Sequence, residues 1–197
     1  SAKLDTKNSP NYPHDKVIQF VFRNFQAVSK YPRKALDLGC GSGANACFLA
    51  EVGFDVTGID GSETGLVNTN QRARAQGLTV ETQLSRLSNF KVPREAFDLV
   101  ISIGVFEFVD AHEAETAIAR SHEALAAGGK ALFLFAADTD FRHEAGGARL
   151  GIRRIRREEI DQLMAPFSGS TFSLDEYITT HDNDAYRQVD WLVTAEK

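Results

Sequence analysis

The stretch ALDLGCGSG, residues 35–43, decides the fold of this chain. It begins with apolar residues typical of a buried strand, carries one acidic residue, Asp37, and ends with glycine at positions 39, 41 and 43. The following stretch ANACFLA, residues 44–50, favours a helix. The order strand, glycine turn, helix is the start of a βαβ unit. Because glycine tolerates positive φ and lacks a Cβ, a ligand can lie directly against this turn.

Two classes of cofactor bind to turns of this kind. Dinucleotides use the spacing G-x-G-x-x-G or G-x-G-x-x-A, which Gly39, Gly41 and Ala44 match only loosely. A carboxylate at the mouth of the turn, here Asp37, would repel a pyrophosphate, but it would attract the ammonium and balance the sulfonium of S-adenosylmethionine. The pattern Asp-x-Gly-x-Gly-x-Gly resembles motif I of the class I S-adenosylmethionine-dependent methyltransferases.

The resemblance covers about residues 30–197 and implies an α/β fold. This fold is a doubly wound, Rossmann-like sheet of seven mostly parallel strands in the order 3-2-1-4-5-7-6, with one antiparallel strand and helices on both faces. We therefore expect a single domain over residues 1–197. Residues 1–29 would form an N-terminal arm and a cap helix over about 14–29, and residues 30–197 would form the core.

Apolar patterns downstream fit this order of elements. Strands are predicted after the first one at 54–60, 78–84, 97–104, 131–136, 171–180 and 186–195. Helices are predicted over about 63–76, over 111–126, and from Glu158 to about Met164. Gly53 and Gly77 are predicted helix ends, and Gly128 and Gly129 a turn into the fifth strand.

The resemblance also implies a set of cofactor-binding residues. Asp60 ends the second predicted strand, where an acidic side chain can accept hydrogen bonds from both ribose hydroxyls in methyltransferases and NAD-binding domains alike. The segment LSRL, residues 84–87, lacks the acidic residue that the family often carries near adenine, so Ser85 would have to replace it. The expected contacts are made by Asp37, Gly39, Cys40, Gly41, Gly43, Asp60, Gly61, Ser62, Ser85, Arg86, Ser102, Gly104 and Tyr12.

No motif assigns a catalytic residue, and four candidates stay open. Glu107 is the one ionisable group in residues 103–108, and we interpret it as a helix-start or surface charge, with a general base as the alternative. Arg142 and His143 lead a segment with six arginines and one glutamate over 142–157, which either binds an anionic acceptor or is a solvated helix face. His14, like Tyr12, is a candidate cleft residue through the cap helix.

Composition limits the partners. The net charge of −5 argues against general binding to nucleic acid or to a membrane surface. The two cysteines form no C-x-x-C, so neither a disulfide framework nor a metal site is expected. Residues 1–10 lack a signal-peptide core, and no apolar run approaches the roughly 20 residues of a membrane span. We expect a cytoplasmic monomer or homodimer that acts on a small molecule.

The leading hypothesis is transfer of a methyl group from S-adenosylmethionine to an O, N or S nucleophile of a small-molecule acceptor, by in-line displacement. Short family members of the tellurite-resistance and thiopurine types look similar. A sensor or inactive partner that binds the cofactor without turnover is an alternative. An NAD(P)-dependent oxidoreductase is less favoured, because the carboxylate of Asp37 would repel its pyrophosphate. A propylamine transferase is less favoured because residues 103–105 carry no acidic side chain to bind an amine.

Overall fold

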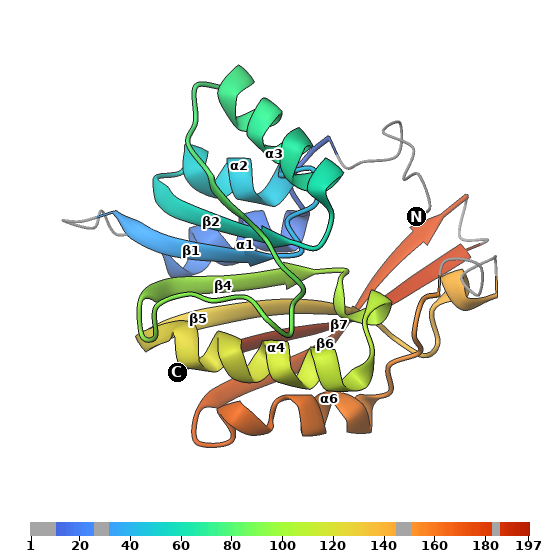
Figure 1. Ribbon diagram of the computed structural model, residues 1–197. Coiled ribbons are helices and arrows are strands. Elements are labelled where there is room, and N and C mark those ends of the chain that lie inside the picture. Colours follow the sequence, from blue (N-terminus) through green and yellow to red (C-terminus); the bar gives the residue numbers. More distant parts are fainter. Residues whose placement is uncertain (1–10, 26–31, 145–150, 183–185) are drawn as a thin grey trace. The chain divides into compact units, whose positions relative to one another are not determined.

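The structure is a computed structural model, and it describes residues 11–25, 32–144, 151–182 and 186–197. The chain divides into two units, residues 1–86 and 87–197. The first contains α1 (Asp15–Asn24), β1 (Arg33–Leu38), α2 (Ala44–Glu51), β2 (Phe54–Asp60), α3 (Glu63–Ala75) and β3 (Glu81–Leu84). The second contains β4 (Phe97–Ile103), the 3₁₀ turn η2 (Phe106–Phe108), α4 (Ala111–Ala124), β5 (Leu125–Ala136), η3 (Phe141–His143), α6 (Arg157–Leu163), η4 (Ala165–Phe167), β6 (Thr171–His181) and β7 (Tyr186–Glu196) (Figure 1).

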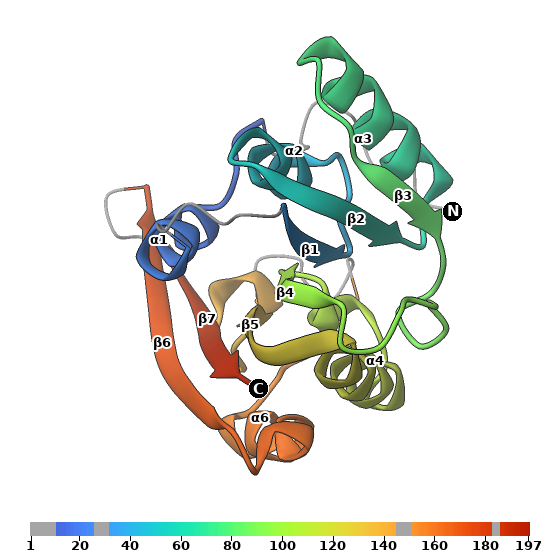
Figure 2. The same ribbon diagram turned by 90° about the vertical axis from the view of Figure 1, so that its left-hand side faces the viewer.

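The first unit alternates strands and helices. β1 pairs in parallel with β2, and β2 in parallel with β3. Figure 2 shows α2 and α3 together above these strands. The side chains of Leu36, Leu49 and Ile59 are completely buried, so strand residues and the apolar face of α2 form one core. α1 buries Val17 and Val21, and its exposed Phe22 contacts Phe48 of α2 with ring centroids 6.1 Å apart.

The second unit ends in an antiparallel hairpin. β4 pairs in parallel with β5, whereas β7 is antiparallel to both β5 and β6. α4 and α6 lie side by side (Figure 1). The core of the second unit contains stacked and edge-on aromatic rings with centroids 5.0 to 6.4 Å apart. These rings belong to Phe106, Phe133, Phe135 and Phe167. Such aromatic pairs bury large areas and prefer these geometries.

The predicted strand order is confirmed. The sheet has seven strands in the order β3-β2-β1-β4-β5-β7-β6, and β7 is the one antiparallel strand. Apolar runs identified the inner strands such as β4 because strands buried on both faces carry near-continuous hydrophobic residues, whereas β3 and β6 are largely exposed.

Two predicted strands have different starting points. β3 begins at Glu81 rather than Leu78, because the backbone N–H of Leu78 donates to Ala73 O at 2.9 Å and closes α3. β5 begins at Leu125, which pairs with Phe97 before the register shifts to Lys130 opposite Leu99. The predicted glycine turn therefore interrupts a longer strand instead of preceding a short one.

Several predictions fall on residues outside the described ranges. The predicted helix over 14–29 contains α1, which ends at Asn24, and residues 26–31 are not described. Residues 1–10 of the predicted arm and positions 145–150 of the arginine-rich segment, Arg149 included, are likewise outside.

Candidate functional site

The turn after β1 requires its glycines. Gly39, Gly41 and Gly43 have φ values of 73, 54 and 79°, a region that side chains rarely adopt. The backbone N–H groups of Gly39 and Cys40 both donate to Ile59 O, at 2.7 and 3.1 Å. A Cβ on Gly43 would lie 2.8 Å from side-chain atoms of Thr69. The left-handed backbone at all three positions and the close contact of Gly43 with Thr69 thus explain the glycine spacing seen in the sequence.

Asp60 braces this turn. Its Oδ2 accepts from the backbone N–H of Gly41 at 2.7 Å, and its Oδ1 accepts from the N–H of Ser62 at 2.7 Å. Ser62 Oγ in turn accepts from Gly65 N–H at 3.1 Å and caps α3, as expected for serine at this position. One carboxylate therefore connects the end of β2, the glycine turn and the start of α3.

Asp37 is a buried carboxyl with an open hydrogen-bonding position. Its side chain is 2% exposed, and its Oδ2 has no hydrogen-bond partner among the described residues. The pKa of Asp37 is raised to about 7, first by burial and then by the charge of Asp60, while the backbone N–H of Ala46 opposes the rise. Two carboxyl groups that repel each other beside a turn of backbone N–H groups favour a ligand carrying positive charge.

Cys40 contributes its backbone rather than its thiol. Its Sγ is buried and lies 3.9 Å from Thr69 Oγ1. Burial raises the pKa of the Cys40 thiol, and the charges of Asp37 and Asp60 raise it further, so the thiol stays protonated. A Cβ on Gly58 would lie 2.8 Å from this sulfur, which explains the glycine within β2.

Three further predicted residues of the first unit, Ser85, His14 and Tyr12, differ in burial and in hydrogen bonding. Ser85 donates its backbone N–H to Asp60 O at 3.0 Å, and its Oγ donates to the carbonyl oxygen of Arg86 at 2.9 Å. His14 caps α1, with Nδ1 accepting from Lys16 N–H at 3.2 Å. The side chain of Tyr12 is 82% exposed. Ser85 thus lies next to Asp60, and the backbone N–H of His14 donates to Asn45 Oδ1 of α2 at 2.9 Å.

Glu107 lies in the first turn of a short helix, as one half of its interpretation expects, but it is not a surface charge, so the other half is wrong. The residue lies in η2, just beyond the end of β4, and is 1% exposed. Neither of its carboxylate oxygens makes a hydrogen bond within the described part of the chain. The pKa of Glu107 is raised to about 7, chiefly by burial; the backbone groups of Glu107 and Ala136 and the charge of Arg142 oppose the rise, and Asp190 adds to it. No local pattern in residues 103–108 predicts this burial, and the neighbouring Phe108 is 53% exposed.

Ser102 and Gly104 lie close to Glu107 in the chain. Ser102 is completely buried in β4. Gly104 has φ of 67° and donates its N–H to Leu134 O at 3.1 Å. A Cβ on Gly104 would lie 3.6 Å from Glu107 Oε1, so the carboxyl lies against the backbone at the carboxyl end of β4. Ligands of open α/β sheets bind at such strand ends.

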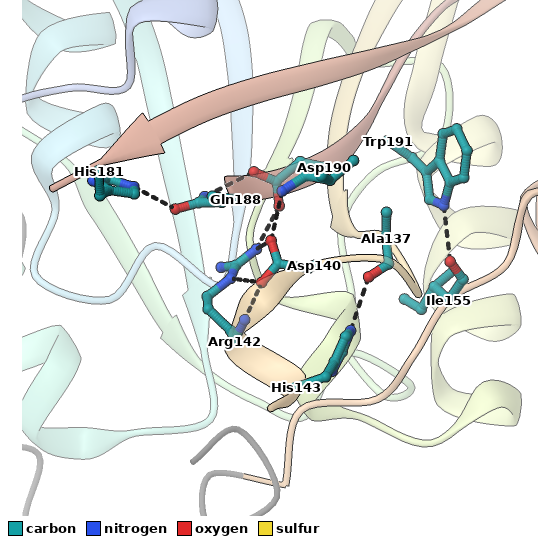
Figure 3. Close-up of polar contacts among 10 residues, drawn as sticks. Ala137, Asp140, Arg142, His143, Ile155, His181, Gln188, Asp190 and Trp191 are labelled. Carbon is teal, nitrogen blue, oxygen red and sulfur yellow. Dashed lines mark hydrogen bonds and ion pairs between the residues drawn. The ribbon is translucent and has the colours of Figure 1, made fainter. Parts of the chain in front are cut away.

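Arg142 is held between two buried carboxylates (Figure 3). Its Nε and Nη2 donate to Asp140 at 2.8 and 3.1 Å, and Nη2 also donates to Asp190 Oδ1 at 2.6 Å. Burial lowers the pKa of Arg142, but Asp140 and Asp190 outweigh burial and raise it. A guanidinium neutralised in this way is poorly placed to bind an anionic acceptor, which disfavours that interpretation of Arg142.

The neighbours of Arg142 are also engaged in the fold. His143 is buried, and its Nε2 lies 2.8 Å from Ala137 O. Further along the segment, Arg153 forms an ion pair with Glu159 and donates from Nε to Val109 O at 3.0 Å. The Arg153–Glu159 contact agrees with the interpretation of this segment as a face paired with acidic residues of the following helix.

The described ranges contain neither a metal-binding cluster nor a membrane-spanning helix. No three histidine, cysteine or acidic side chains there are grouped so that they could hold a metal ion. In the same ranges, no helix has the length and apolar character needed to cross a membrane.

Sequence comparison places this geometry among known proteins. Residues 35–129 match the family described as "Methyltransferase domain". The probable S-adenosyl-L-methionine-dependent methyltransferase TehB of Haemophilus influenzae (strain 10810) is 32% identical over 109 residues, which are 55% of this chain and 38% of that protein. A ubiquinone biosynthesis O-methyltransferase of Rickettsia canadensis is 30% identical over 94 residues, which are 48% of this chain and 39% of that protein. The chain thus spans less than two fifths of these relatives.

Solved structures share the fold. The crystal structure of TehB from Haemophilus influenzae superposes with a TM-score of 0.73 at 20% identity, covering 97% of this chain and 64% of that one. The YcgJ protein of Bacillus subtilis superposes with a TM-score of 0.74 at 14% identity, covering 93% and 99%. The match over residues 35–129 is thus to the methyltransferase domain family, and the likeness to these solved structures shows the class I, Rossmann-like fold.

Proposed function

We propose that this chain binds S-adenosylmethionine at the glycine turn and transfers its methyl group to a small-molecule acceptor. The observation that carries the proposal is the buried carboxyl of Asp37, whose Oδ2 has no partner among the described residues, beside three left-handed glycines. S-adenosylmethionine has both an ammonium and a sulfonium, so it offers the positive charge that this carboxyl lacks.

The residues of the first unit fit the other parts of the cofactor. Each carboxylate oxygen of Asp60 accepts one backbone N–H and keeps a lone pair with which it can accept from a ribose hydroxyl. Ser85 is hydrogen-bonded to the backbone of Asp60 and is proposed to lie near adenine. The other proposed contacts are those of Tyr12, Gly39, Cys40, Gly41, Gly43, Gly61, Ser62 and Arg86, and of Ser102 and Gly104 in the second unit.

The chain's contribution to the reaction is mainly orientation. When bound, S-adenosylmethionine supplies an electrophilic methyl carbon. Holding an acceptor in line with that carbon removes several kcal/mol of barrier, on the order of 7 or more in favourable cases. The relatives named as methyltransferases support this activity, and the name of the ubiquinone biosynthesis O-methyltransferase supports a small-molecule acceptor.

Parallel calorimetric titrations with S-adenosylmethionine, S-adenosylhomocysteine and NAD test the proposal, after mass spectrometry has excluded a co-purified nucleoside. We expect both adenosyl compounds to bind and NAD not to bind. Binding of NAD alone would refute the proposal. Binding of S-adenosylmethionine without S-adenosylhomocysteine formation, across a broad panel of acceptors, would favour a sensor.

A further inference from the structure

Thr69 of α3 is hydrogen-bonded to the glycine turn that follows β1. Its side chain is completely buried, and its Oγ1 donates to the carbonyl oxygen of Gly41 at 2.8 Å. Because the single hydroxyl hydrogen of Thr69 is used in this bond, the thiol is the donor in the 3.9 Å contact between Cys40 Sγ and Thr69 Oγ1. One side chain of α3 is therefore connected to two consecutive residues of the turn.

α3 lies very close to the backbone of the turn. A Cβ on Gly65, one helical turn before Thr69, would lie 3.1 Å from Gly41 O. Residues four apart in a helix lie on the same face, so Gly65 and Thr69 form the face of α3 that meets the turn. Glycine inside a helix lowers the stability of the helix, and this close approach explains why α3 contains one.

Gly41 differs from its neighbours in the turn because one of its faces is uncovered. In the part of the chain that the structure describes, a Cβ on Gly41 would meet only Gly39 O, at 3.9 Å, apart from the adjoining residues. The N–H of Gly41 is held by Asp60, and its carbonyl oxygen is held by Thr69. The backbone of Gly41 is thus fixed at both ends, while one side is open to a ligand.

The bond from Thr69 also sets the direction of the next N–H group, that of Ser42. The peptide bonds of the described residues are all trans, and the C=O and N–H of a trans peptide point in opposite directions. Because the Gly41 carbonyl is directed at α3, the N–H of Ser42 is directed away from α3. Among residues 39–43, Ser42 is the one whose N–H has no acceptor within the described chain.

We infer that Thr69 is a positioning residue of the cofactor site, which holds the turn so that the N–H of Ser42 donates to the carboxylate of S-adenosylmethionine. This inference rests on the proposed binding of that cofactor at the glycine turn. The amino-acid end of S-adenosylmethionine carries an ammonium and a carboxylate. Asp37 offers an acceptor to the ammonium through its unpartnered Oδ2, and Ser42 offers a donor to the carboxylate. An N–H bond to a carboxylate is charge-assisted and is stronger than a neutral one.

Calorimetric titration with S-adenosylmethionine and with its decarboxylated form tests this role. The decarboxylated compound keeps the sulfonium and the ammonium and lacks only the carboxylate. Thr69→Val, which replaces the hydroxyl by a methyl group, should weaken binding of S-adenosylmethionine about fivefold, as expected for one hydrogen bond, and binding of the decarboxylated form less than about twofold. Thr69→Ser keeps the hydroxyl and should restore the affinity for S-adenosylmethionine.

Thr82→Val is the matched control. The Thr82 hydroxyl accepts from Asn70 Nδ2 at 3.0 Å, so it connects α3 to β3 rather than to the turn. This variant should bind both compounds within about twofold of the wild type. A loss in Thr69→Val that is the same for both compounds, or no larger than the loss in Thr82→Val, would overturn the inference.

Amide NMR of the wild-type chain tests the inference without any variant. The Ser42 amide signal should move when S-adenosylmethionine or S-adenosylhomocysteine is added, because both carry the carboxylate, and much less with the decarboxylated form. A Ser42 signal that stays in place while S-adenosylmethionine binds, or that moves equally with all three compounds, would overturn the role of Thr69 and Ser42. Failure of the wild type to bind S-adenosylmethionine would instead refute the proposed function.

Discussion

Asp60 Oδ2 lies 2.7 Å from the backbone N of Gly41 and accepts its hydrogen, so the last side chain of β2 holds the turn that follows β1. The second oxygen of the same carboxylate holds Ser62 at the start of α3. The residue that was expected to bind ribose therefore also shapes the turn against which the rest of the cofactor would lie.

Replacing Asp60 should affect both roles. We expect Asp60→Ala to weaken binding of S-adenosylmethionine at least tenfold, which corresponds to about 1.4 kcal/mol, and to lower the melting temperature because two backbone N–H groups lose their acceptor. Titration calorimetry and thermal unfolding measure the two effects. An unchanged affinity would remove Asp60 from the site.

Asp37→Asn keeps the size of the side chain and removes its charge. We expect at least a tenfold loss of affinity for S-adenosylmethionine at about pH 8, because an opposite charge in a buried site favours binding of the cation. Methylthioadenosine, which lacks the ammonium and the sulfonium, is the matched ligand and should lose much less. Equal losses for both ligands would show that Asp37 does not recognise the positive charge.

The two raised carboxyl pKa values predict a pH dependence of stability. The folded chain keeps protons on Asp37 and Glu107 up to about pH 7, whereas the ordinary values for these side chains are 3.8 and 4.5. Between these limits the folded state binds more protons, so the free energy of unfolding should fall as pH rises, by at most about 1.4 kcal/mol per pH unit and group.

Urea denaturation from about pH 4 to pH 7.5 measures this slope. Asp37→Asn and Glu107→Gln should each flatten it, and the double variant should do so most. A slope that is the same in the double variant and the wild type would assign the pH dependence to other groups.

The glycine turn predicts a pair of contrasting alanine variants. Gly43 and Gly77 both have positive φ, at 79 and 68°, but only at Gly43 would a Cβ collide with Thr69. We expect Gly43→Ala to be more destabilising than Gly77→Ala by about 1–3 kcal/mol and to impair cofactor binding. Equal losses of stability would show that Thr69 gives way without cost.

Arg142→Ala should destabilise the second unit. It leaves Asp140 and Asp190 buried without their cation, which typically costs about 3–5 kcal/mol. Arg154→Ala is the control, since the Arg154 guanidinium makes an exposed 3.4 Å contact with Asp138 O and should change stability by less than about 0.5 kcal/mol. Chemical denaturation compares the two, and similar small effects would return Arg142 to the list of candidate anion-binding residues.

Local signals explain what the sequence could predict. The positions of Gly39, Gly41 and Gly43 demand a turn, Ser62 marks a helix start, and apolar runs mark buried strands, so each element could be recognised from a few neighbouring residues. Strand order came from the family resemblance. Errors in the predicted strands lay at their ends, as at Leu78, where the choice between closing a helix and extending a strand depends on one hydrogen bond.

Long-range packing explains what the sequence could not predict. Arg142 and Asp190 are 48 residues apart in the chain, so no local pattern reveals that one neutralises the other. The burial of Glu107 likewise depends on side chains from other elements that cover η2. The two glutamates Glu107 and Glu113 are similar in sequence, and only the folded structure separates the satisfied carboxyl from the unsatisfied one.

Trp191 is the single tryptophan of the chain. It is buried in β7 and donates its indole N–H to Ile155 O at 2.8 Å (Figure 3). Ile155 in turn forms an isolated bridge with Ala137, the residue after β5. Intrinsic fluorescence of this protein therefore reports on the contact between β7 and the segment around Ile155 in the second unit. Circular dichroism reports on the secondary structure of both units. Comparing the two thermal unfolding curves would reveal whether the two units unfold together or separately.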